Sequence, residues 1–147
     1  WVITCRYLGV FFHAHRNFKC VFDNAKKAYY RSFNSVFGKV GRHASEEVIL
    51  KLIQSKCLPV ILFGLDACPV NSSDKHSFDF MLTRSLMKLF NTGSNLVIME
   101  CRKAFNVKLL SESIIDRNKS FLYRYCNTEN VICKMFCDEA ASELLLL

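Results

Sequence analysis

The sequence contains no stretch near the ~20 consecutive apolar residues that a membrane-spanning helix needs. The run at residues 57–65 is nine residues long and contains Pro59 and Gly64. The chain also begins at Trp1 without an initiator methionine, and it lacks the basic-then-apolar order of a signal peptide. We therefore expect a fragment cut from a larger protein, in a nuclear or cytoplasmic setting and with no membrane partner.

Motifs of independent catalysis are also absent. There is no Tyr/Phe-x-Asp-Asp turn, no Gly-x-Ser-x-Gly elbow, no phosphate-binding glycine loop and no Cys-His pair at a suggestive spacing. Two-metal phosphoryl transfer needs clustered carboxylates that hold cations about 4 Å apart. Asp66, Asp74 and Asp79 are better explained as helix-end and surface residues. We expect no catalytic residue, no metal ligand and no cofactor in this chain.

The eight cysteines form no Cys-x-x-Cys pair, which excludes the commonest zinc and redox motifs. They are scattered along the chain, and the four histidines lie far in sequence from the pair Cys133 and Cys137. We therefore expect reduced thiols. Cys133 and Cys137 are four residues apart and should share one helix face as small apolar core residues.

Positive charge is present in abundance, and it is concentrated near the N-terminus. Up to residue 60 the chain has ten Lys and Arg but three Asp and Glu, while the ten bases and ten acids that follow cancel. The whole net charge of +7 therefore belongs to the first 60 residues. Such asymmetry indicates a polyanionic partner. A merely solvated helix face is the alternative.

The apolar pattern predicts a mainly α fold with a short N-terminal β-hairpin. With 147 residues, 51% of them apolar, the chain can bury a core of its own. Residues 3–13 are rich in β-branched and aromatic side chains around Gly9, which is typical of a hairpin. Apolar residues then recur at helical spacing, which predicts helices at 22–40, 45–57, 74–90, 95–105 and 112–126 and a last one after a Thr128 cap. Ser45 should cap the second helix, and Pro59 should end or kink it.

The segment at residues 59–65 is apolar on every side, so we expect it at the centre of the core. Ile61 and Leu62 in particular should be almost inaccessible to solvent.

Two motifs carry a family resemblance. Arg6-Tyr7-Leu8-Gly9-Val10 resembles the primer-grip strand pair of reverse transcriptases from non-LTR (LINE-type) retrotransposons. Ser45-Glu46 and then Cys57-Leu58-Pro59-Val60-Ile61-Leu62-Phe63-Gly64-Leu65-Asp66 resemble the thumb signature of the same enzymes, with Phe63 in place of the usual Tyr and Asp66 in place of the usual Glu. The resemblance covers most of the chain. It implies a primer grip at residues 1–20, a helical thumb at 21–110 and a helical extension at 111–147.

The resemblance also implies the partners. An RNA template and a DNA primer would lie against this chain, and the missing upstream palm and fingers would supply catalysis together with Mg²⁺. The hairpin at Tyr7-Leu8-Gly9-Val10 would then press on the primer strand near its end, and Arg6, Tyr7, Leu8 and Gly9 would be nucleic-acid-binding residues.

The first helix supplies the remaining nucleic-acid-binding candidates. Lys26, Lys27 and Arg31 lie off its apolar face and could follow phosphates, and Tyr30 lies among them. Tyr30 could contact a sugar or base, or could simply be a half-buried tyrosine. Two alternatives to a polymerase fragment stay open, namely a helical module whose basic face binds an acidic protein and a functionless remnant of a mobile element.

Overall fold

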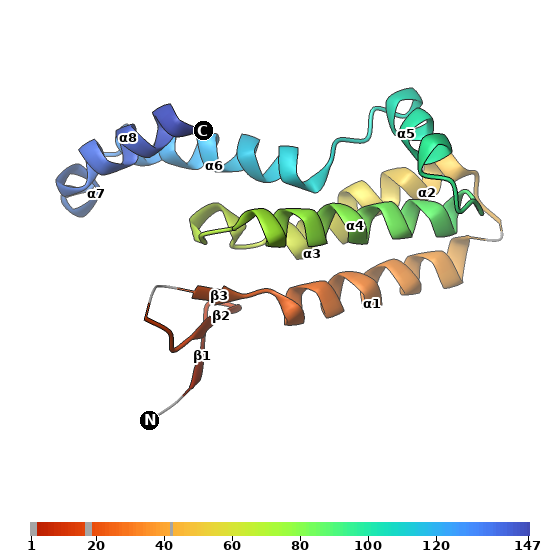
Figure 1. The fold of residues 1–147 in the computed structure, drawn as a ribbon, viewed down its shortest axis with the longest axis horizontal. Helices are drawn as coiled ribbons and strands as arrows, with labels where there is room; N and C mark the ends of the chain where they lie inside the picture. The colour runs from red at the N-terminus through yellow and green to blue at the C-terminus, as the bar shows by residue number, and fades with distance from the viewer. Residues whose placement is uncertain (1–2, 17–18, 42) are drawn as a thin grey trace.

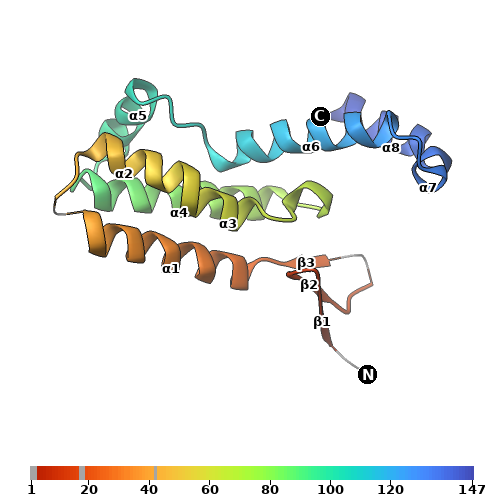
Figure 2. The same cartoon turned by 180° about the vertical axis from the view of Figure 1, so that it is seen from behind.

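The computed structural model describes residues 3–16, 19–41 and 43–147. It confirms the mainly α fold, because a short antiparallel sheet is followed by helices as far as residue 146. Three long helices set the architecture, α1 (Asp23–Val40), α4 (Ser72–Leu89) and α6 (Leu110–Cys126). Figures 1 and 2 show α4 between α1 and α6, with the sheet beside the start of α1.

The sheet has one strand more than the predicted hairpin. β1 (Thr4–Tyr7) pairs with β2 (Val10–His13), as expected, and β2 also pairs with β3 (Lys19–Val21). Three residues are too few to display an alternating pattern, so β3 gave no signal in the sequence. The register places Val10 and Phe12 against the core, and the opposite face of the sheet points away from it.

The second predicted helix is helical throughout, and Pro59 does not end it. The chain runs from α2 (Glu46–Leu52) through a π-helical turn, η1 (Ile53–Cys57), into α3 (Leu58–Leu62). In the π turn the N–H of Leu58 donates to the carbonyl of Ile53. Pro59 lies directly after this π turn, in the first turn of α3. Ser45 does occupy the N-cap of α2, but its side chain makes no capping hydrogen bond, so that prediction was wrong.

Only part of the segment at residues 59–65 is buried, although all of it was predicted to be. Ile61 is 0% exposed and Leu62 is 8% exposed, which confirms both as core residues. Val60 and Phe63 are 36% and 63% exposed, so the prediction that the whole segment lies at the centre of the core was wrong. The helix presents one side of this run to the core and the other to the surface. A short 3₁₀ turn, η2 (Leu65–Ala67), follows it.

The C-terminal region differs from prediction in its last turns. After α5 (Asn95–Ala104) and α6, the expected single helix is divided into α7 (Val131–Met135) and α8 (Cys137–Leu146). Asn130 rather than Thr128 caps α7, because its side chain accepts a hydrogen bond from the N–H of Ile132. Cys133 and Cys137 therefore lie on different helices and do not share a face.

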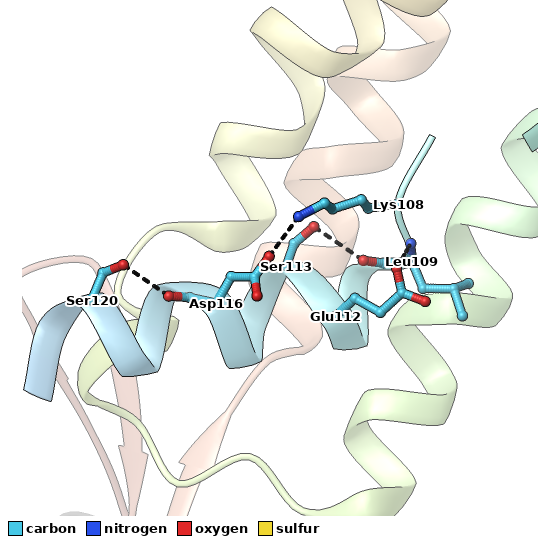
Figure 3. Close-up of polar contacts among 6 residues, drawn as sticks. All are labelled: Lys108, Leu109, Glu112, Ser113, Asp116 and Ser120. Carbon is cyan, nitrogen blue, oxygen red and sulfur yellow. Dashed lines mark hydrogen bonds and ion pairs between the residues drawn. The ribbon is translucent and has the colours of Figure 1, made fainter. Parts of the chain in front are cut away.

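The first turns of α6 are held by local polar contacts (Figure 3). The Glu112 carboxylate accepts from the N–H of Leu109 at 3.3 Å, and the Ser113 hydroxyl donates to the Leu109 carbonyl at 3.0 Å. The Lys108 ammonium and the Asp116 carboxylate are 2.7 Å apart, and this pairing lowers the pKa of Asp116 and raises that of Lys108.

The three aspartates that a catalytic reading would have recruited have structural roles instead. Asp79 on α4 accepts a hydrogen bond from the N–H of Ser111 at 2.9 Å, so it caps α6 from a neighbouring helix. Asp66 accepts two bonds from the Arg117 guanidinium, at 2.7 and 2.9 Å, which ties η2 to α6 and raises the pKa of Arg117. Asp74 lies in the first turn of α4, where its negative charge interacts favourably with the positive end of the helix dipole.

Candidate nucleic-acid interface

The four predicted residues of α1 fall on two adjoining faces of the helix. Lys27 and Arg31 are exposed and lie four positions apart, on the side that faces solvent. Lys26 and Tyr30, also four apart, lie on the edge that faces α4, where the Lys26 ammonium is 5.3 Å from the centre of the Phe78 ring. The structure thus brings these four side chains together along the first three turns of α1.

Helix α4 adds two cations that the sequence did not point to. The Lys88 ammonium donates to Asn34 Oδ1 on α1 at 3.2 Å and lies 5.1 Å from the centre of the Phe37 ring. The Arg84 guanidinium lies near Tyr30, where its charge favours the phenolate and partly offsets the rise in the pKa of Tyr30 that burial causes. Because that pKa is still raised, Tyr30 is neutral at physiological pH.

The facing edges of α1 and α4 enclose an open groove of about 600 Å³. None of the residues that line it carries a carboxylate. They are Tyr30, Phe33, Asn34, Arg84, Ser85, Met87, Lys88, Asn91, Thr92 and Gly93. We call this feature, with Lys26, Lys27 and Arg31 beside it, the α1–α4 basic groove. Within residues 3–16, 19–41 and 43–147, none of its five cations forms an ion pair with an acid. Its positive charge is therefore available to an anionic partner.

The predicted hairpin residues lie apart from this groove. The Arg6 guanidinium is 5.7 Å from the centre of the Phe11 ring, and both lie on the face of the sheet that points away from the core. Tyr7 and Leu8 are exposed, and Leu8 and Gly9 form the two-residue turn with φ of 46° and 86°, both in the left-handed region. These φ angles are typical of a tight hairpin turn.

A second hollow, of about 420 Å³, lies between the sheet and the groove. Phe11, His13 and Lys19 line it from the sheet, and Lys26 lines it from α1, together with the carboxylates of Asp23 and Asp74. Lys26 therefore borders both hollows. The predicted residues therefore lie along one surface that continues from the sheet to α4, although the hairpin residues do not contact the α1–α4 basic groove.

The two segments that carry the family resemblance pack against each other. A Cβ built on Gly9 would be 3.1 Å from Cε1 of Phe63, and one built on Gly64 would be 2.7 Å from Cγ2 of Val10. The hairpin turn thus docks on the turn that follows α3. The close approach needs a glycine at position 64, whereas a Cβ at position 9 would require the Phe63 ring to shift by a few tenths of an ångström. Phe63 is covered only in part by this contact.

In the part of the chain that the structure describes, no three His, Cys, Asp or Glu side chains converge so that they could hold a metal ion. Across the same residues, no helix has the length and apolar character to cross a membrane. Comparison of the chain with protein-family models, curated proteins and solved structures found no match.

Proposed function

We propose that this chain holds the backbone of a primer–template duplex as the thumb region of a reverse transcriptase of the non-LTR retrotransposon type. The observation that carries the proposal is the α1–α4 basic groove, in which five cations and an exposed tyrosine lie together without an acidic partner among the described residues. Phosphates are the ligands that such an arrangement suits, because each neutralised phosphate releases a condensed counterion.

The spacing of the cations suits a phosphate backbone. Lys27 and Arg31 on α1, and Arg84 and Lys88 on α4, are each four positions apart, which corresponds to about 6 Å along a helix. Each pair therefore places two positive charges in line along its helix, which suits the repeating negative charges of a phosphate backbone. Contacts of this kind position a duplex and read its groove shape, and they carry little sequence information.

The hairpin has a second role in this proposal. By resemblance, Tyr7, Leu8 and Gly9 contact the primer strand near its end, and Arg6 lies next to them on the sheet. The upstream palm and fingers of the parent protein would hold Mg²⁺ and carry out nucleotide addition. The chain described by the structure would bind and orient the duplex, and it would not extend it.

A competition experiment separates this proposal from the alternative of an acidic protein partner. A labelled RNA–DNA hybrid is bound by the chain at several salt concentrations and followed by fluorescence anisotropy. Unlabelled hybrid should displace it efficiently, whereas polyglutamate of matched charge should not, because its carboxylates lack the regular geometry of a nucleic-acid backbone. Equal displacement by polyglutamate would assign the basic groove to protein binding.

A further inference from the structure

The α1–α4 basic groove has features that backbone binding does not require. A run of cations on a flat surface would be sufficient to follow phosphates, but this surface is hollowed to about 600 Å³. That volume lies within the range of small-molecule and nucleotide pockets. It is also lined by the aromatic ring of Tyr30 and by amide and hydroxyl groups from Asn34, Asn91 and Thr92.

The ring of Tyr30 is held in place by the buried ring of Tyr29. The ring of Tyr29 packs edge-on against it, with centroids 5.7 Å apart and an interplanar angle of 72°. Tyr29 is itself fixed, because it is fully buried and its hydroxyl donates to Ser85 Oγ at 3.1 Å, while Ser85 donates to the Met81 carbonyl at 3.1 Å. Tyr30 remains 39% exposed. It therefore offers a supported ring surface that needs little ordering on binding.

Cations flank this ring. Arg84 lines the same groove as Tyr30, with its guanidinium 5.9 Å from the centre of the Phe80 ring, and Lys88 is held in the groove by its bond to Asn34 Oδ1. With that oxygen engaged, the side-chain nitrogen of Asn34 is the amide group left to donate to a ligand. An aromatic ring with neighbouring cations is the arrangement by which proteins bind single-stranded nucleic acid, since a base stacks on the ring while its phosphate is neutralised.

We propose that the α1–α4 groove takes one unpaired nucleotide, whose base stacks on Tyr30 and whose phosphate lies between Arg84 and Lys88. Bases inside a duplex are stacked on each other, so only an unpaired base can reach the ring. The inference rests on the proposed function, and it narrows the ligand to a duplex that carries a single-stranded overhang or bulge next to the bound phosphates.

The test uses two RNA–DNA hybrids, one blunt and one with a single unpaired 2-aminopurine at its end. Stacking on Tyr30 should quench the emission of 2-aminopurine when the chain binds. Tyr30→Ala should abolish the quenching and weaken binding of the overhang hybrid by roughly 5- to 150-fold relative to binding of the blunt hybrid. Tyr30→Phe keeps the ring and should behave as the unaltered chain. Tyr123→Ala, which removes an exposed tyrosine from α6, is the matched control and should change neither signal.

The possible failures are distinguishable. Equal affinity for both hybrids with unaltered 2-aminopurine emission would overturn the nucleotide site and leave duplex binding intact. Loss of quenching in Tyr30→Phe would also overturn it, because the hydroxyl and not the ring would then be the contact. No binding of either hybrid at any salt concentration would overturn both the site and the proposed function. Circular dichroism of every variant establishes that it is folded.

Discussion

Gly64 lies where the hairpin docks on the helices, and its replacement by alanine should destabilise the protein by about 2–5 kcal/mol. Two terms add up to this figure. Gly64 has φ of 74°, a left-handed conformation that costs an L-residue roughly 1–2 kcal/mol. The new Cβ would also be 2.7 Å from Cγ2 of Val10, and such overpacking costs about 1–3 kcal/mol.

A double-mutant cycle with Val10→Ala isolates the second term. Val10→Ala alone loses packing, but in the Gly64→Ala background it also removes the methyl group that clashes. The double variant should therefore be more stable than the sum of the single effects predicts, by about 1–3 kcal/mol. Urea denaturation followed by circular dichroism measures each corner of the cycle.

Gly93→Ala is the matched control, because a Cβ there would meet no atom within 4 Å. It should be neutral or slightly stabilising. If Gly64→Ala cost no more than Gly93→Ala, or if the effects of Val10→Ala and Gly64→Ala were additive, the hairpin would not dock on this turn as described.

Two further predictions concern the core. Ile61→Ala should cost about 2–5 kcal/mol in urea denaturation, because it leaves a cavity, whereas Val60→Ala on the exposed side of the same helix should cost less than about 1 kcal/mol; equal costs would contradict the helix orientation. Burial raises the pKa of Tyr29 from 10.0 to about 12, so its contribution to stability is complete below pH 10 and is lost as the pH rises towards 12. Two pKa units correspond to roughly 3 kcal/mol, and Tyr29→Phe should flatten the fall in the free energy of unfolding between pH 10 and 12 by about that amount; an undiminished fall would show that Tyr29 ionises freely in the folded state.

The long helices could be predicted because their apolar periodicity extends over five turns. The sequence indicated helices at 22–40 and 74–90, and the structure has Asp23–Val40 and Ser72–Leu89. Shorter elements depend on tertiary contacts. β3 exists because β2 offers it an open edge, and Pro59 is accommodated by a π turn that no local pattern indicates.

Only the α1 side of the α1–α4 basic groove could be predicted from the sequence. Lys27, Tyr30 and Arg31 stand out as an exposed group within one helix. Arg84 and Lys88 do not stand out in the sequence, because the acids in the second part of the chain equal its bases in number and leave no excess of positive charge there. The contact that adds α4 to the groove, between Asn34 and Lys88, joins residues 54 positions apart. Sequence spacing carries no information about such a pairing.

The salt dependence of hybrid binding tests the central claim most directly. The variant replaces Lys27, Arg31 and Arg84 with Gln; Lys26 is retained because its ammonium also packs on the buried Phe78 ring. The control replaces Lys103, Lys119 and Arg124 on α5 and α6, which makes the same change in net charge on the other side of α4 from α1 (Figure 1).

With about 0.9 counterions released per phosphate, loss of up to three contacts should reduce the slope of log affinity against log salt by about two to three units. The control should keep the slope of the unaltered chain. Equal slopes for the groove variant and the unaltered chain, with both folded by circular dichroism, would contradict the assignment of this groove to the nucleic-acid backbone.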